Sequence, residues 1–132
     1  MSRVIERFLR YVKIDTQSEE GSGRFPTTEK QHDLARLLVQ ELTEMGASEI
    51  VYDREHCYVY ASVPASEGMG NEPVLGLVAH MDTSPAVTGA DVKPRLIENY
   101  DGNDILLNAE NGTVMKVEDF PELSAYQGKR LI

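Results

Sequence analysis

The sequence predicts an α/β fold, because helical and strand-like patterns alternate along its 132 residues. Apolar side chains recur at helical spacing over residues 4–12 and again over 34–45. Residues 49–52 and 58–63 are rich in β-branched and aromatic side chains, and they are typical of two paired strands. The unbroken apolar run 74–79 is typical of a strand buried on both faces of a sheet.

The two helical segments differ in how clearly the sequence marks their ends. The first places charged residues between the apolar ones, and a polar loop with glycines and a proline follows it over 15–27. The second helix is expected to begin at Thr28, because Gln31 three residues later completes a capping box. Gly46 is expected to end it, since helices commonly terminate at a glycine in the left-handed conformation.

The carboxyl-terminal part of the sequence is less regular. Residues 105–107 and 113–115 are predicted strands around a turn at the Asn-Gly pair 111–112. A short helix is expected within 121–128, between a proline and a glycine. The chain stops at 131–132, two apolar residues that have the pattern of the first half of a strand.

Composition restricts the class of protein. The length predicts one domain over 1–132. The net charge of −9 argues against a nucleic-acid or anionic-membrane partner, because no basic cluster could neutralise a row of phosphates. One cysteine, Cys57, excludes an internal disulfide. No stretch approaches the length of a membrane span, and the start of the sequence lacks the apolar run of a signal peptide. We expect a soluble, cytoplasmic protein.

His80 and Asp82 are the strongest candidates for chemistry, because they directly follow the apolar run 74–79. Ligands of open α/β sheets bind outside the carboxyl ends of strands, and two residues spaced by two point the same way on a strand. A neutral imidazole is a good zinc ligand, and a nearby carboxylate can hold its other N–H. The alternative is an exposed, hydrogen-bonding histidine. His32 and His56 are expected to be solvated surface residues.

Four segments, taken in order, carry a family resemblance. They are residues 7–18 (RFLRYVKIDTQS), 27–35 (TTEKQHDLA), 76–85 (GLVAHMDTSP) and 97–102 (IENYDG). Together they resemble the peptidase T family, the aminotripeptidases of the dinuclear zinc exopeptidase superfamily. The resemblance implies a three-layer α/β/α domain with a mixed, mostly parallel sheet, of which this chain is an incomplete part. It also implies a reaction with two zinc ions that releases the N-terminal residue of tripeptides.

The resemblance implies roles for two residues of this chain. His80 corresponds to a zinc ligand of the family. Asp82 corresponds to the aspartate counted as catalytic, which supports the imidazole. The family's bridging aspartate, proton-shuttling glutamate, remaining zinc ligands and dimerising lid domain are expected to lie beyond Ile132, since family members are much longer.

The sequence is therefore interpreted as the amino-terminal portion of the catalytic, zinc-binding domain of a peptidase T-like protein. Small peptides are the expected partners, with a homodimer formed through the absent lid domain, and the fragment alone is expected to be inactive. Two alternatives stay open. One is a related zinc dipeptidase or deacylase, and the other is a non-catalytic binding module on the same scaffold.

Overall fold

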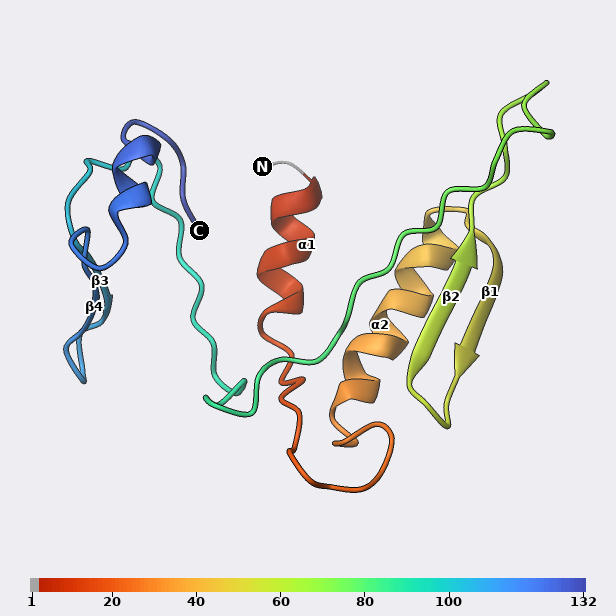
Figure 1. Cartoon of the computed structure of the whole chain (residues 1–132), viewed down its shortest axis with the longest axis horizontal. Helices are drawn as coiled ribbons and strands as arrows, with labels where there is room; N and C mark the ends of the chain where they lie inside the picture. The colour runs from red at the N-terminus through yellow and green to blue at the C-terminus, as the bar shows by residue number, and fades with distance from the viewer. Residues whose placement is uncertain (1–2) are drawn as a thin grey trace. The chain divides into compact units, whose positions relative to one another are not determined.

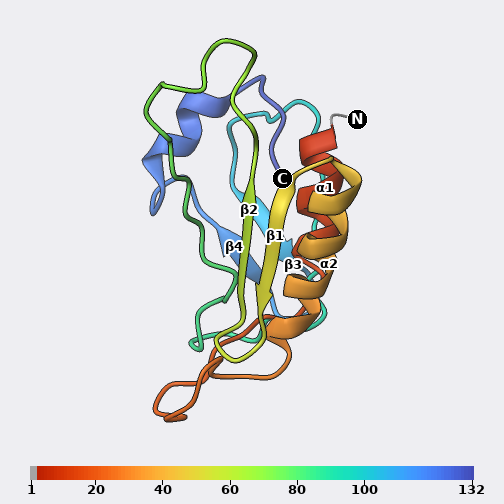
Figure 2. The ribbon, with the colours of Figure 1, turned by 90° about the vertical axis from the view of Figure 1, so that its right-hand side faces the viewer.

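A computed structural model describes residues 3–132, which form two compact units. One unit ends at Val92 and the other covers Lys93–Ile132. Both combine helical and strand segments, so the predicted mixed α/β character is confirmed (Figures 1 and 2). No helix within residues 3–132 is long and apolar enough to span a membrane.

The first unit pairs two helices with a β-hairpin. Its elements are α1 (Arg3–Tyr11), α2 (Gln31–Glu44), β1 (Ser48–Asp53) and β2 (Tyr58–Ser62). Strands β1 and β2 are antiparallel and set Val51 opposite Tyr60, with a register irregularity nearer the start of β1. Helix α2 packs along this hairpin and buries Leu34 and Ala35 (Figure 2). The predicted hairpin is therefore confirmed.

The two ends of α2 differ in how well the sequence predicted them. The structure confirms that Gly46 follows the end of the helix, with φ +78°. The N–H of Gly46 donates to the carbonyl of Thr43, and the N–H of Ala47 donates to the carbonyl of Leu42 at 3.0 Å. These paired bonds form a Schellman motif. The predicted capping box is wrong. Helix α2 begins at Gln31, and no side chain caps its first turn. The hydroxyl of Thr28 donates to the carbonyl of Gln17 and accepts from the side chain of Gln31.

Glu41 of α2 joins the two helices. The residue is only 4% exposed, and Arg7 Nε lies 3.0 Å from its Oε2. Arg10 and Tyr11 of α1 also donate to its carboxylate. Burial alone would raise the pKa of Glu41, but the Tyr11 hydrogen bond and the two guanidinium charges outweigh it and hold the pKa below its usual value. Helix α1 is thus held to α2 by ionised contacts.

Removing both cations should destabilise this unit more than removing the buried acid. We expect Arg7→Ala with Arg10→Ala to lower the free energy of unfolding by about 3 kcal/mol, because the buried carboxylate loses both charges. Glu41→Gln should lower it by about 1–2 kcal/mol, since the arginines left behind are partly exposed to water. Denaturant titration followed by circular dichroism measures both values. A larger loss in Glu41→Gln would contradict this assignment.

The pH dependence provides the control for that comparison. Because folding lowers the pKa of Glu41 from 4.5, its stabilising contribution is present above that pH and is lost as the pH falls through the folded pKa. The unaltered chain should therefore lose this contribution in acid. In the double arginine variant, burial is expected to raise the pKa of Glu41. The contribution of Glu41 to the free energy of unfolding should then have the opposite sign from that in the unaltered chain.

The second unit is built around a short hairpin and a buried tyrosine. Strand β3 (Ile105–Asn108) pairs antiparallel with β4 (Thr113–Met115), as predicted, and the 3-10 helix η1 (Pro121–Tyr126) follows. Tyr100 is buried, and its hydroxyl donates to the carbonyl of Asn103 at 2.6 Å. Leu131 forms an isolated antiparallel bridge with Ile97, so the end of the chain has a strand-like partner.

The prediction of a central strand over 74–79 is wrong. These residues form no strand, and the described sheets are the two separate hairpins. Val74, Leu75, Leu77 and Val78 are each more than four-fifths exposed. A strand needs a neighbour for its backbone N–H and C=O groups, and neither hairpin pairs with this segment. The mostly parallel sheet of three layers therefore stays a prediction.

Candidate functional site

His80 and Asp82 lie within hydrogen-bonding distance of one another, as predicted. His80 Nδ1 is 3.0 Å from Asp82 Oδ1. The pair follows an extended segment, not the strand that was predicted to present it. The side chain of His80 is 83% exposed and that of Asp82 is 44% exposed. In a neutral imidazole this contact places the hydrogen on Nδ1, which leaves the Nε2 lone pair free to bind a metal.

The described residues supply one such imidazole and no complete metal site. Within residues 3–132, no three His, Cys, Asp or Glu side chains are grouped closely enough to hold a metal ion. A catalytic zinc site requires three protein ligands. The donor chemistry of His80 and Asp82 therefore fits one ligand position and its supporting carboxylate, and the remaining positions have no candidates here.

The other two histidines make separate contacts. His56 is exposed, as predicted, and its Nδ1 lies 2.8 Å from Asp53 Oδ2, a contact that raises the pKa of the imidazole. The prediction of a solvated His32 is wrong. Its side chain is only 12% exposed, because it packs edge-on against Tyr52 and its Nδ1 contacts the Tyr52 hydroxyl at 2.5 Å. Neither histidine joins His80.

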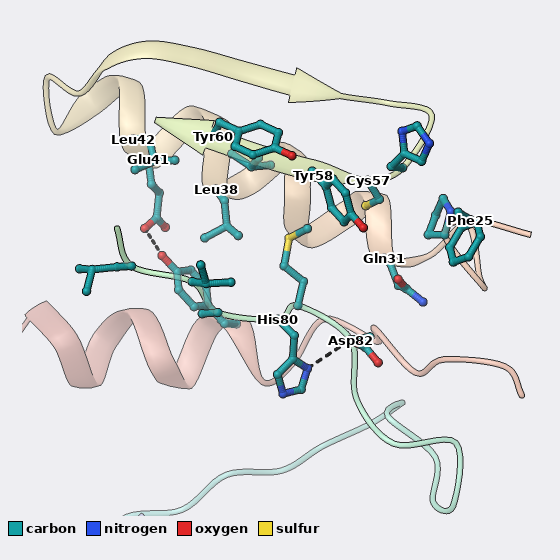
Figure 3. Close-up of a pocket in the computed structure, with 18 of the residues that line it drawn as sticks. Phe25, Gln31, Leu38, Glu41, Leu42, Cys57, Tyr58, Tyr60, His80 and Asp82 are labelled. Carbon is teal, nitrogen blue, oxygen red and sulfur yellow. Dashed lines mark hydrogen bonds and ion pairs between the residues drawn. The ribbon is translucent and has the colours of Figure 1, made fainter. Parts of the chain in front are cut away.

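A cavity of about 720 Å³ adjoins the His80–Asp82 pair. Figure 3 shows side chains of α2 and β2, among them Leu38 and Tyr60, on one side of it and His80 with Asp82 on the other. Cys57 also lines it, and burial raises the pKa of that thiol, so it is not an activated nucleophile. The sequence did not predict this cavity, because its wall comes from five separate segments: Tyr11, 25–27, α2, 56–60 and 77–82.

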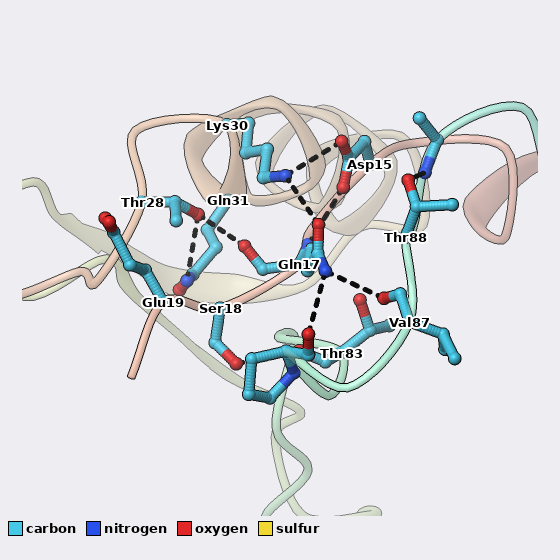
Figure 4. A network of polar contacts seen from close by, with 12 residues as sticks. Asp15, Gln17, Ser18, Glu19, Thr28, Lys30, Gln31, Thr83, Val87 and Thr88 are labelled. Carbon is cyan, nitrogen blue, oxygen red and sulfur yellow. Dashed lines mark hydrogen bonds and ion pairs between the residues drawn. The ribbon is translucent and has the colours of Figure 1, made fainter. Parts of the chain in front are cut away.

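Sequence reasoning also missed a polar network beside the pair. Asp15, Gln17 and Lys30 contact one another, and Gln17 reaches the backbone of residues 85–87 (Figure 4). Asp15 and Gln17 lie in the predicted loop 15–27 and Lys30 in the predicted second helix, and nothing in the sequence indicated that they contact one another. The contacting residues are far apart in the sequence and close together in space, so no local sequence pattern reveals them.

Comparison with known proteins finds relatives that share one name and match this chain over its whole length. It is 53% identical to peptidase T of Caldanaerobacter subterraneus subsp. tengcongensis, 54% identical to peptidase T of Desulfitobacterium hafniense and 49% identical to peptidase T of Alkaliphilus oremlandii. Each match covers 100% of this chain. The chain is thus similar over its whole length to proteins named peptidase T. No family model matches the sequence.

The homology to peptidase T confirms the family resemblance that the four motifs predicted. The chain spans about a third of the length of these curated relatives, since each match covers 32% of the relative. His80 and Asp82 lie inside the matched region because the matches include every residue of the chain. The roles of these two residues stay predictions.

Proposed function

We propose that this sequence is part of a zinc-dependent aminopeptidase that releases the N-terminal residue from tripeptides. The observation that carries the proposal is an imidazole already oriented by a carboxylate in a chain that is homologous to peptidase T throughout. The name of the relatives supports peptidase activity. Zinc dependence and tripeptide preference follow from the resemblance described above.

In the proposed site, His80 would hold a zinc ion through Nε2. Asp82 accepts the Nδ1 hydrogen, which fixes the imidazole tautomer and ring orientation. Bound zinc would polarise the scissile carbonyl and lower the pKa of a bound water. The other ligands, the proton-transferring carboxylate and any dimerising domain are proposed to lie in the part of the relatives that this chain does not cover.

A chimaera tests this function with the residues of this chain in place. The 132 residues would replace the matched segment of the Caldanaerobacter relative, which aligns over 132 positions. We expect hydrolysis of simple tripeptides that a chelator removes and zinc restores. Release of free N-terminal amino acid is the measurement, and the unaltered relative is the control.

The same assay distinguishes the alternatives. Dipeptides and N-acyl amino acids are offered beside the tripeptides at equal concentration. Faster turnover of either would replace the tripeptide proposal with the dipeptidase or deacylase alternative. A folded chimaera with no turnover of any of the three, while the relative is active, would contradict a catalytic role for this sequence.

A further inference from the structure

The segment that follows Asp82 is held by the backbone of an earlier loop. Thr83 donates its N–H to the carbonyl of Thr16 at 3.1 Å, and its own carbonyl accepts from the N–H of Ser18 at 2.9 Å. The hydroxyl of Ser18 donates to the same carbonyl at 2.8 Å. These bonds form an isolated parallel bridge between Gln17 and Thr83, one residue past Asp82. Thr16 is buried at this junction.

The side chain of Gln17 extends this attachment along the loop. Its Nε2 donates to the carbonyl of Val87 at 2.8 Å and to that of Pro85 at 3.2 Å. Its Oε1 accepts from Lys30 Nζ at 3.3 Å. An amide has one donor end and one acceptor end, so the ammonium of Lys30 selects the orientation that turns the N–H groups toward the two carbonyls.

Asp15 completes a closed set of contacts with these residues. Its Oδ2 accepts from Lys30 Nζ at 2.9 Å, and its Oδ1 accepts from the backbone N–H of Gln17 at 3.0 Å. The loop returns so close to this carboxylate that a Cβ built on Gly89 would lie 2.7 Å from Asp15 Oδ1. Only glycine fits at that position without moving the contact. The loop 83–89 is therefore attached at several points.

The His80–Asp82 pair has no comparable support on its other side. Residues 74–79 form no backbone ladder, and the side chain of His80 is largely exposed while that of Asp82 is partly exposed. An exposed hydrogen bond between two free side chains contributes little by itself. The fixed point nearest to the pair is therefore the bridge at Thr83.

We propose that Asp15, Gln17 and Lys30 form a clamp that fixes residues 83–87 and thereby holds Asp82 where it engages His80 Nδ1. Gln17 is a positioning residue, because it acts on the pair through the loop and touches neither side chain. Any consequence for catalysis rests on the proposed function. The structural claim can be tested on the 132-residue chain itself.

Gln17→Ala is the direct test, and two measurements report on it. The first is hydrogen exchange of the amides of Ser18 and Thr83, which should accelerate by about tenfold when the attachment weakens. The second is the nitrogen chemical shifts of the His80 imidazole at about pH 8, above the usual imidazole pKa of about 6.5. The His80 signals are assigned by their absence in His80→Ala. We expect the Nδ1–H tautomer to dominate in the unaltered chain and to lose population in Gln17→Ala.

Three further variants make the interpretation specific. Gln17→Glu keeps the acceptor for Lys30 but turns a carboxylate oxygen toward two carbonyls, so it should release the loop at least as much as Gln17→Ala. Lys30→Arg keeps the cation and should retain the tautomer preference of the unaltered chain. Gln127→Ala is the matched control, since Gln127 Nε2 also donates to a backbone carbonyl, that of Asp101 at 3.1 Å in the other unit. It should leave both measurements unchanged.

Two results would overturn the clamp. One is a Gln17→Ala chain that exchanges like Gln127→Ala, and the other is a released loop with an unchanged His80 tautomer. The amide signals of β1 and β2 show whether each variant is folded, and Lys30→Ala replaces Gln17→Ala if that variant is not. Because neither measurement uses peptide or zinc, failure of the proposed peptidase function would leave these outcomes readable.

Discussion

His80→Ala in the chimaera is expected to remove bound zinc and peptidase activity together. The imidazole is the metal donor that the proposed site takes from this chain, and its Nε2 is left free by the contact between Nδ1 and Asp82. Loss of a direct ligand should reduce turnover more than the roughly 10–100-fold that follows loss of an outer partner of a ligand. Metal analysis and tripeptide hydrolysis on the same sample measure the two effects.

Asp82 provides the matched comparison, because its proposed role acts through the imidazole. Asp82→Ala should weaken zinc affinity by about 10–100-fold and reduce activity, yet excess zinc should restore metal content. Asp82→Asn can still accept a hydrogen bond and should show the smaller loss. If His80→Ala kept its zinc and its normal turnover, the assignment of His80 as a ligand would be wrong.

The elements that the sequence predicted correctly have their causes close together in the chain. Gly46 ends α2 because a glycine readily takes the left-handed conformation that the closing bonds require. The turn at Asn111-Gly112 joins β3 to β4 for the same local reason, with Gly112 at φ +71°. In each case a few neighbouring residues decide the backbone conformation.

Predictions that depended on distant partners were less successful. The apolar run 74–79 has the composition of a buried strand, but composition supplies no neighbouring strand to receive its hydrogen bonds. Thr28 has the spacing of a capping residue, but its hydroxyl bonds Gln17 instead. His32 is largely shielded from water because β1 brings Tyr52 against it. No local pattern states which of these competing partners is present.

The candidate site shows the same division. The contact between His80 and Asp82 could be predicted from their spacing and residue types, and it is present without the strand that was expected to align it. The clamp at Gln17 could not be predicted, because its acceptors at Pro85 and Val87 lie far along the chain. The sequence thus indicated the chemical groups, and the structure supplied a means of holding them.

The 132-residue chain by itself is expected to release no N-terminal residue from tripeptides, to bind zinc weakly and to self-associate. One imidazole with one supporting carboxylate leaves most coordination positions to water, and no group of three ligands exists within residues 3–132. The exposed apolar run 74–78 is a surface that water hydrates poorly, and each described two-stranded sheet also has edges without a partner strand. Zinc titration, tripeptide assay and sedimentation at several protein concentrations measure these properties.

Val78→Lys tests whether the apolar run causes the association, because Val78 is 100% exposed in the described chain. Association should weaken at least about tenfold, the effect expected from losing the burial of one valine side chain. Val4→Lys is the matched control: it makes the same substitution at a 74% exposed position of α1, and it reduces the net charge of −9 equally. Equal effects of the two variants would assign the association to charge, and zinc-dependent turnover by a monomer would contradict the expectation of an inactive chain.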